Sequence, residues 1–494
     1  MSPVCDTEFV KEAFRPARDH LETLIHQLHG DAADEMQHDQ AEALIKNDGY
    51  EIMRRLVQGF LDVRARHEKR MESIEGSDGV VRTQCREDCE RDLMTEFGEV
   101  VVRRKGYAAK GTGSLFPLDA ALNLPEDKYS SELCRLVARE VADSSFDESV
   151  DGIQETTGGV VPKRQIIEQT VKMSQDFDAF YRLPGDPEKR SDLLVITVDG
   201  KGIVMREEDL RPATRKAAEA QDNSRGAHLT SGEKPNRKRM AMVAAVYSLP
   251  VQERTPEQIM GPKEKKPAAV RAQNKRVWAS IEHDSLSVIT AAFEEALKRD
   301  PTQSRHWVVV VDGGEQQLIN ILDVAQSYQA RITLVLDLIH VLEYLWKASR
   351  CFHPVGSSLA EEWVKEKALQ ILHGGSGNVA VDLRRDATRN QLGQKKREPV
   401  DKCADYLDKY SVMLEYDSFL SDGLPIASGV IEGACRHLIK DRLDRTGARW
   451  RLKSAEAIIR IRSLRSSGDF DAYWKFHREQ ELQRNHFCRY AAAA

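Results

Sequence analysis

The sequence predicts an α/β fold preceded by a mainly helical N-terminal region. Two apolar runs of strand length, 193–198 and 307–311, each end at an aspartate that a glycine follows. Apolar residues recur at helical spacing in residues 1–80, and further helical segments alternate with the strand-like runs. At 494 residues the chain is too long for one compact core, so several structural units are expected.

The first 185 residues divide into two expected regions. Residues 1–92 are expected to be helical, with a role in packing or oligomerisation. Residues 93–185 are expected to open with a short strand pair at 93–107. Three helices follow between 130 and 175, with Ser130 or Ser131 and then Ser145 as caps and with Pro162 in the first turn of the third helix.

The last two of these helices have the pattern of a helix-turn-helix, since a short helix, a glycine turn and a helix with polar residues at its start follow one another. Lys163, Arg164 and Gln165 lie at that start and are the candidate DNA contacts. Polar residues are also common at ordinary helix starts, so plain three-helix packing remains the alternative.

Strands and helices alternate after a polar linker at 185–191. In residues 192–345 we expect strands at 193–198 and 240–247, a helix at 286–297, the strand at 307–311, a helix at 316–325 and a strand at 332–336. This β-β-α-β-α-β order, with carboxylates at strand ends, is that of an RNase H-like catalytic core. An α-helical insertion is expected at 346–420, the final core helix and a basic segment at 421–465, and a C-terminal tail at 466–494.

Three carboxylates are the candidate catalytic residues and metal ligands: Asp199, Asp312 and Glu432. Oxygen ligands suit Mg²⁺, for which Mn²⁺ can substitute, and two aspartates and a glutamate suffice for two metals in phosphoryl transfer. Each residue also has a simpler interpretation. Asp-Gly is a common turn pair, and a glutamate at position 432 could pair with Arg436 on the helix surface. The apolar neighbours of Glu432 favour a glutamate on the buried face of a packed helix.

Asp337 and His340 follow the last predicted strand directly and are assigned a supporting role, either orienting the site or contacting DNA. Asp337 also competes with Asp312 as the second metal ligand, although Asp312 is preferred.

The segment from 436 to 465 is basic although the whole chain carries a net charge of −6. It holds ten lysines and arginines and three acidic residues, which favours a surface that follows phosphates over a mixed solvated face. Trp450 could stack on an unpaired base or pack in the core. The candidate DNA contacts here are Arg436, Lys440, Arg445, Arg449, Trp450 and Arg451.

Composition limits the remaining possibilities. No apolar run reaches the length of about 18–20 residues of a membrane helix, and the first residues lack the pattern of a signal peptide. The eight cysteines include no Cys-x-x-Cys pair, so reduced thiols are expected. Cys85 and Cys89 are four residues apart without a second pair, which makes zinc binding there improbable.

Several segments together resemble a bacterial insertion-sequence DDE transposase of the Kra-type family, within the Mutator-like superfamily. The resemblance extends from about residue 95 to 477. It rests on residues 116–119, 177–181, 198–202, 239–247, 312–313, 429–433, 447–450 and 468–474. Relatives often carry cysteine pairs before the Pro-Leu-Asp of residues 117–119. Tyr-Ala-Ala-Lys stands at 107–110 here, which puts a zinc ribbon in doubt.

The resemblance implies a Mg²⁺-dependent enzyme that cuts and joins DNA at the terminal inverted repeats of an insertion sequence. Asp199, Asp312 and Glu432 match its catalytic residues, and Asp337 and His340 match an element that precedes its helical insertion. Its expected partners are double-stranded DNA, as transposon ends and as target, and further copies of the chain in a dimer or larger multimer. A cytoplasmic, nucleoid-associated protein is expected. The alternatives are an inactive, transposase-derived DNA-binding protein and an RNase H-fold structure-specific nuclease.

Overall fold

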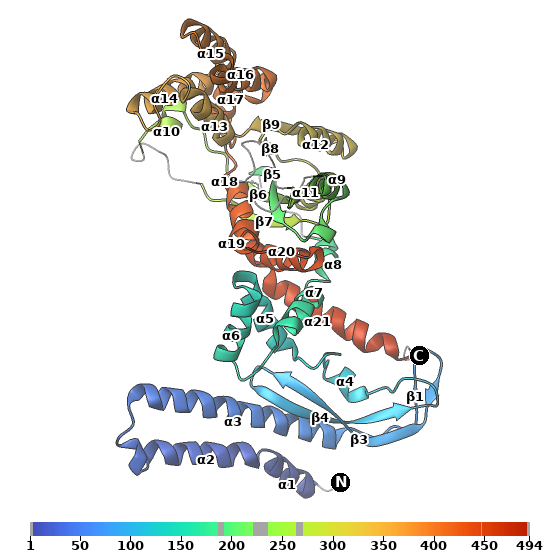
Figure 1. Ribbon diagram of the computed structural model, residues 1–494. Coiled ribbons are helices and arrows are strands. Elements are labelled where there is room, and N and C mark those ends of the chain that lie inside the picture. Colours follow the sequence, from blue (N-terminus) through green and yellow to red (C-terminus); the bar gives the residue numbers. More distant parts are fainter. Residues whose placement is uncertain (1–2, 186–191, 221–235, 263–269, 446, 492–494) are drawn as a thin grey trace. The chain divides into compact units, whose positions relative to one another are not determined.

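The structure is a computed structural model that describes residues 3–185, 192–220, 236–262, 270–445 and 447–491, without the side chains of 3–6 and 32. The chain divides into two compact units of mixed helix and strand (Figure 1). Unit 1 comprises Met1–Arg182 and Asp469–Ala494, and unit 2 comprises Leu183–Gly468. Residues 186–191 of the predicted linker lie outside the described residues. Residues 221–235, in a charged segment that follows the first predicted strand of the sheet, also lie outside them.

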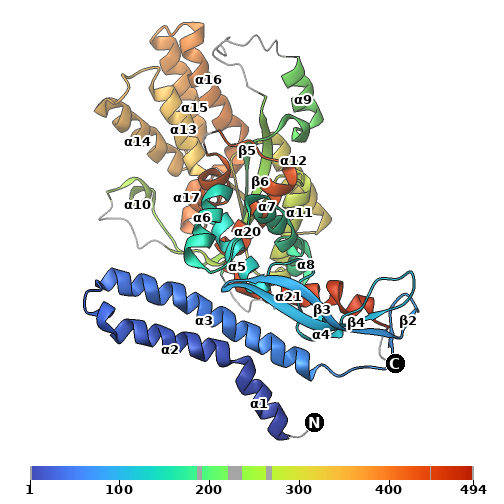
Figure 2. The same ribbon diagram turned by 60° about the horizontal axis from the view of Figure 1, so that its bottom comes forward.

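Unit 1 begins with helices, as predicted. They are α1 (Pro3–Ala13), α2 (Arg15–His29), the short 3₁₀ helix η1 (Asp31–Ala33) and α3 (His38–His67). Helices α2 and α3 run side by side (Figures 1 and 2). Leu61 of α3 packs in one apolar cluster with Leu93, Val100, Val102 and Leu124, so the helical region and the following strands share a core.

A β-hairpin follows, and it is longer than predicted. The strands of this part are β1 (Ile74–Glu75), β2 (Val81–Arg82), β3 (Gln84–Thr95) and β4 (Gly98–Ala108), and β3 pairs antiparallel with β4 from Thr95↔Gly98 outwards. The strand pair predicted at 93–107 is confirmed, but residues 74–92 were wrongly expected to be helical. Most of β3 is polar and exposed, and its apolar residues appear only near Leu93, where the prediction began.

The three helices predicted between 130 and 175 are confirmed. The remaining helices of unit 1 are α4 (Pro117–Ala121), α5 (Ser131–Asp143), α6 (Phe146–Thr156), α7 (Lys163–Met173), α8 (Phe177–Arg182), α21 (Phe470–Asn485) and the 3₁₀ helix η6 (Phe487–Arg489). Ser130 and Ser145 accept hydrogen bonds as N-caps of α5 and α6, whereas Pro162 is the N-cap of α7 and does not enter its first turn.

The turn between α6 and α7 is fixed against the tip of the hairpin. The Gly158 amide donates to Glu96 O at 2.8 Å. A Cβ on Gly158 would lie 2.5 Å from Phe97 O, and one on Gly159 would lie 2.6 Å from Thr95 O. Both glycines therefore serve a close approach to the hairpin backbone.

The last part of the chain is a helix of unit 1 and not a tail. In α21 the Tyr473 hydroxyl donates to Met173 O at 2.6 Å, and Asp471 accepts from Arg135 at 2.6 Å. Helix α21 thus packs against α5 and α7, and Phe470, Tyr473 and Trp474 are buried.

Unit 2 is built on one mixed sheet of five strands in the order β7-β6-β5-β8-β9. The strands are β5 (Leu193–Val204), β6 (Lys238–Leu249), β7 (Gln273–Ser280), β8 (Trp307–Val311) and β9 (Ile332–Leu336). Strand β6 is antiparallel to both its neighbours, and β5, β8 and β9 are mutually parallel. Four of these strands were predicted; β7 was missed because Gln273–Arg276 is polar or charged and hides the short apolar run that follows.

Helices cover the sheet and extend from one end of it (Figure 1). Those that follow or precede strands in the chain are the 3₁₀ helix η2 (Glu207–Asp209), α9 (Pro212–Glu219), α11 (Ser285–Arg299), α12 (Glu315–Ser327) and α20 (Leu452–Ser467). Helix α10 (Pro256–Met260) packs against α14 instead. The region predicted at 346–420 is helical as expected: α13 (Leu338–Ser349), α14 (Ser358–Leu372), α15 (Ser376–Arg389), α16 (Gln394–Lys409), the 3₁₀ helix η4 (Ser411–Met413) and α17 (Tyr416–Ser421).

A continuous helical stretch follows at 429–443. It consists of α18 (Gly429–Ala434), a π-helical segment η5 (Cys435–Lys440) and α19 (Asp441–Leu443). Among the residues that the structure describes, no helix has both the length and the apolar character needed to cross a membrane.

A buried carboxylate fixes the start of the central parallel strand β8. Asp300 accepts hydrogen bonds from the indole N–H of Trp307 at 2.9 Å, from the Arg305 amide at 2.9 Å and from the Ser304 amide at 3.0 Å. Burial alone would raise the pKa of Asp300, but these hydrogen bonds outweigh it and lower the pKa. The carboxylate is therefore stabilised in its charged form.

Replacement of this carboxylate tests the network. Asp300→Asn should destabilise unit 2 by about 1–3 kcal/mol at pH 7, because an amide group would face N–H donors. Since the folded pKa lies below the unfolded one, the contribution is present above about pH 4 and is lost as the pH falls through the folded value. Urea unfolding followed by tryptophan fluorescence should therefore show wild type and variant converging at acid pH. Asp323→Asn, at an exposed position of α12, should behave like wild type.

Candidate functional site

Asp199 lies inside a strand and not at its end, contrary to the prediction. Strand β5 continues with β6 as far as Val204, but its pairing with β8 stops at Thr197↔Val310. Beyond this pair β8 no longer pairs with β5. Instead, the side chain of Gln317 donates to Val198 O at 2.8 Å. Asp199 is half-buried, and its Oδ1 accepts from the Gly200 amide at 2.6 Å.

Asp312 directly follows β8, as predicted. The last β5–β8 pair is Thr197↔Val310, so Asp199 and Asp312 both lie two residues beyond it on adjacent parallel strands. Adjacent strands are about 4.8 Å apart, and residues two apart share a face of the sheet. The topology therefore places the two aspartates at one edge of the sheet, at matching positions.

The loop that carries Asp312 is fixed by tyrosines of α16 and the residue after it. The Tyr406 hydroxyl donates to Asp312 O at 2.8 Å, and the Tyr410 hydroxyl donates to Gly313 O. Gly313 has a φ of +88°, and a Cβ there would lie 2.9 Å from the Tyr410 ring. The helical region after β9 thus determines the backbone conformation at Asp312.

Asp337 and His340 lie at the start of α13. Asp337 is 1% exposed, and its Oδ1 accepts from the Ile339 amide at 2.9 Å. Its Oδ2 accepts from the Ser428 hydroxyl and lies 3.6 Å from His340 Nδ1. The charge of Asp337, with smaller contributions from Asp312 and Glu343, raises the pKa of His340 although burial opposes it.

Glu432 lies on α18 and is exposed, whereas the sequence favoured a buried face. The apolar neighbours Ile431, Ala434 and Cys435 do pack inwards, and Glu432 is left on the opposite side of the helix. Arg436, the expected surface partner of Glu432, has Asp441 3.5 Å away from its Nε.

The pKa of Glu432 shows which groups surround it. Partial burial raises this pKa first, and the negative charge of Asp337 raises it next. His340 offsets part of the effect, while Glu343 and Asp199 add to it. Glu432 is therefore close enough to two of the other predicted acids to feel their charges, although the residues are far apart in sequence.

Two members of this site were not predicted. The Cys435 thiol lies 3.2 Å from Asp199 Oδ2 and donates to it, and burial together with Asp199 raises the pKa of Cys435. Glu343 is exposed on α13. The sequence could have indicated Glu343, because residues 337, 340 and 343 are three positions apart and therefore lie on one face of a helix. No sequence pattern joined Cys435 to Asp199.

We call Asp199, Asp312, Asp337, Glu343, Glu432 and His340 the acidic cluster. It brings five carboxylates together with one histidine. Asp337 is its buried member, and the predicted metal ligands Asp199, Asp312 and Glu432 all keep contact with solvent. Their ligand atoms are not gathered tightly. Within the described ranges, only Asp176, His477 and Glu481 of unit 1 place three ligand atoms within 4.8 Å of one another.

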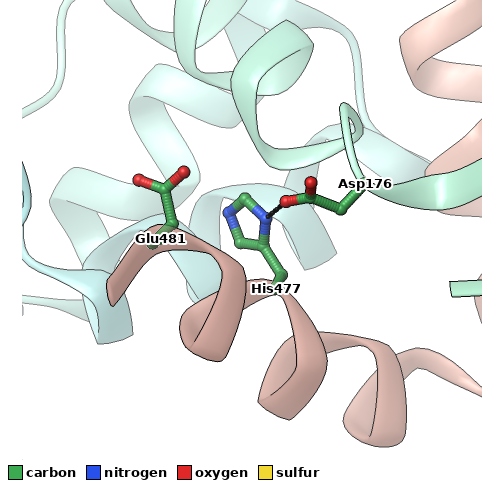
Figure 3. A group of neighbouring side chains, drawn as sticks. All are labelled: Asp176, His477 and Glu481. Atoms are coloured by element: carbon green, nitrogen blue, oxygen red, sulfur yellow. Dashed lines mark hydrogen bonds and ion pairs between the residues drawn. The ribbon is translucent and has the colours of Figure 1, made fainter. Parts of the chain in front are cut away.

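Figure 3 shows that group in unit 1, in which the His477 ring faces Asp176. A neighbouring arginine, Arg484, binds both of its carboxylates. His477 Nδ1 lies 2.7 Å from Asp176 Oδ2, and Arg484 donates to Asp176 Oδ1 and to Glu481 Oε1. The other Glu481 oxygen accepts from Asn485 at 2.7 Å. These contacts attach α21 to the residues between α7 and α8, which explains the cluster without an ion.

The basic segment is less exposed than its composition suggests. Arg442 and Arg462 are buried, and Arg462 donates to His437 O at 2.8 Å. Trp450 is 7% exposed, and its indole donates to Leu443 O at 3.0 Å. The predicted stacking of Trp450 on a base is therefore wrong, since the ring is part of the core. The other predicted contacts of the segment are all exposed: Arg436, Lys440, Arg445, Arg449 and Arg451.

The predicted contacts at the start of α7 have acidic neighbours. Lys163 lies 2.7 Å from Asp147, and Arg164, which is highly exposed, lies 2.9 Å from Glu168. Gln165 is half-buried. The positive potential of this helix start is therefore weaker than its sequence indicates.

No model of a known protein family matches this chain, and no curated protein is similar to it in sequence.

Neutralising Glu432 should stabilise the metal-free protein. Because the folded pKa of this acid is raised, its ionisation works against folding, and the stability of wild type should fall as the pH rises through that value. Glu432→Gln should therefore raise Tm at pH 8 by about 1–3 °C, a modest amount because the side chain is exposed.

Thermal unfolding in EDTA between pH 4 and pH 8 measures this effect. Glu361→Gln, at an exposed position of α14, is the control and should leave Tm unchanged. A lower Tm for Glu432→Gln at pH 8 would contradict repulsion within the acidic cluster.

Proposed function

We propose that this protein is a DDE transposase with an RNase H-like core, which cuts and joins DNA at the ends of an insertion sequence. The observation that carries the proposal is the sheet order, in which the first strand is central, the second and third lie on one side and the fourth and fifth on the other. An acid on the first strand and an acid after the fourth lie at matching positions of neighbouring strands, and the acid on a late helix is affected by the charge of Asp199. Helices α14 to α17 would be the insertion in such a core.

The acidic cluster has the donor chemistry that a divalent cation requires. Glu432 is repelled by Asp337, Glu343 and Asp199, and His340 provides the main opposing charge. Asp199, Asp312 and Glu432 would hold Mg²⁺, or Mn²⁺ in its place. When bound, the metal would supply charge neutralisation at the reacting phosphate and a more acidic attacking hydroxyl.

Asp337 is better suited to positioning than to metal binding. Both its oxygens accept hydrogen bonds, from the Ile339 amide and from the Ser428 hydroxyl, and the side chain is buried. Ser428 immediately precedes α18, so this contact ties the helix of Glu432 to the end of β9. Asp312 is half-buried, and its Oδ1 accepts from the Gly314 amide at 2.9 Å. Its Oδ2 has no hydrogen-bond donor among the described residues, which favours Asp312 as the second ligand.

The residues of the site would have different roles in phosphoryl transfer. Asp199 and Asp312, at matched positions of β5 and β8, would hold the cations that orient the scissile phosphate. His340, whose pKa is raised, can donate a hydrogen bond to a phosphate oxygen. The Tyr406 and Tyr410 hydroxyls keep the Asp312 loop from moving as charge develops.

DNA would be bound by exposed lysine and arginine side chains that follow Glu432 in the sequence. Arg436 and Lys440 follow Glu432 within the same helical stretch, and Arg449 and Arg451 precede α20. The helices α5 to α7 of unit 1 would read the terminal repeats, with Lys163 and Arg164 as phosphate contacts. Paired ends call for at least two copies of the chain, so a dimer or larger complex is proposed.

Substitution of the proposed ligands tests the reaction. Asp199→Asn, Asp312→Asn and Glu432→Gln should each reduce Mg²⁺-dependent cleavage of DNA carrying the inverted repeats that flank the gene, by about 10³-fold or more. Asp337→Asn should keep measurable cleavage and require more Mg²⁺, because it acts through Ser428 and His340.

The control Glu361→Gln should cleave like wild type. Full activity of Asp312→Asn would exclude that residue as a ligand, and loss of activity in Asp337→Asn alone would assign the role to Asp337. With pre-cut ends, joined products distinguish a transposase from a nuclease, which would yield none.

Removing exposed cations should weaken DNA binding in a salt-dependent way. The double variant Arg449→Ala/Arg451→Ala should lower duplex affinity, and the slope of log K against log salt should fall by about 1.8 if both contact phosphates. Fluorescence anisotropy between 50 and 200 mM salt, roughly the range over which such contacts are lost, measures both quantities. Arg385→Ala/Arg389→Ala on α15 is the matched control, and an equal effect of the two pairs would argue against a defined surface.

A further inference from the structure

A polar cavity of about 150 Å³ lies within unit 1, away from the acidic cluster in sequence. It is lined by β3, β4, the segment around α4 and the residues from Asn485 to Tyr490. Three arginines contribute to its wall, namely Arg91 from β3, Arg104 from β4 and Arg489 from η6. Arginines from three separate elements thus border one cavity.

Arg104 is the innermost of these arginines. It is 7% exposed, its guanidinium lies 4.2 Å from the centre of the Phe116 ring, and its Nε lies 2.8 Å from Asp119 Oδ1. Its Nη1 is buried and has no hydrogen-bond acceptor among the described residues. A buried N–H without an acceptor is costly, so Arg104 keeps unused hydrogen-bonding capacity beside the cavity.

The acids in the wall do not balance the arginines. Arg91 and Arg104 share a single carboxylate, Asp119, at 3.9 and 2.8 Å. Burial raises the pKa of Asp119, and the charges of Arg104 and Arg91 counter this only in part. The wall holds three arginines and two carboxylates, Asp119 and Glu126. Arg489 pairs with Glu126 at 3.0 Å, but both side chains are exposed and such pairs are weak. The cavity therefore has an excess of positive charge.

We propose that this cavity binds a phosphate group. A tetrahedral oxyanion offers acceptors in several directions and can therefore meet arginines from three elements. Ser114 and Asn485 add polar side chains to the wall. The inference goes beyond the proposed function, because it involves unit 1 alone and requires no reaction at the acidic cluster.

Substitutions of exposed wall residues can either weaken or strengthen phosphate binding while the buried core stays unchanged. Arg489→Ala removes a cation and should weaken binding of inorganic phosphate by about fivefold or more. Glu126→Gln removes the competing anion and should strengthen it by about two- to fivefold. Arg478→Ala is the matched control: its side chain is 48% exposed, like that of Arg489, and it too is paired with one glutamate, yet it does not line this cavity.

Calorimetric titration of the full-length protein with inorganic phosphate, against chloride at equal ionic strength, measures these affinities. A phosphate-specific rise in Tm, opposite effects of Arg489→Ala and Glu126→Gln, and an unchanged Arg478→Ala support the site. Arg104→Lys, which keeps the charge but loses the planar donor group, should weaken binding as well. The proposal is overturned if phosphate acts no more strongly than chloride, or if Arg489→Ala and Arg478→Ala behave alike.

A second arm identifies the source of the phosphate. If the group belongs to DNA, Arg489→Ala should weaken binding of a duplex, and inorganic phosphate should compete with the duplex more strongly than chloride does. If it is a free anion, duplex affinity should be the same in Arg489→Ala and wild type while phosphate binding is weakened. Both results retain the site, and neither depends on cleavage, so failure of the transposase proposal would be recognised separately.

Discussion

The parallel pairing of β5 with β8 is the constraint on which the candidate site depends. The pairing ends at Thr197↔Val310, and the two aspartates lie two residues further on, at matching positions of neighbouring strands. Parallel strands require a crossover between them, and here β6, β7 and α11 occupy the intervening chain. The crossover is stabilised by a buried core, in which residues 193–198 and 307–311 are almost entirely shielded from water. The stability of the sheet thus supports two carboxylates that repel each other.

The helical region after β9 contributes to the site directly. Tyrosine hydroxyls from α16 and from Tyr410 bind the backbone of the Asp312 loop, and Tyr416 donates to Leu336 O at 2.7 Å at the end of β9. The two strand ends nearest the acidic cluster are therefore held by residues of one helical segment. This helical region couples the geometry of the acids to the packing of helices, and its loss would loosen the site even where no acidic residue is removed.

The two units differ in how their charged side chains are paired. In unit 1 most buried ions are matched by a partner, as with Arg484 between Asp176 and Glu481. In unit 2 the acidic cluster contains several carboxylates of like charge, and their repulsion of Glu432 contributes to its raised pKa. Uncompensated charge of one sign is costly unless a ligand offsets it, so such places mark binding sites. The same reasoning identifies the arginine-lined cavity of unit 1, where the excess has the opposite sign.

The sequence by itself determined the local features of this protein. Helical spacing predicted α5, α6 and α7 with their serine caps, and apolar runs predicted four of the five strands, because period and capping are properties of neighbouring residues. Tertiary structure alone decided that Asp199 lies inside a strand, that Glu432 is exposed, that Trp450 is buried and that Cys435 contacts Asp199. These outcomes depend on pairing register and on packing between segments far apart in sequence, and neither is encoded in the spacing of nearby residues.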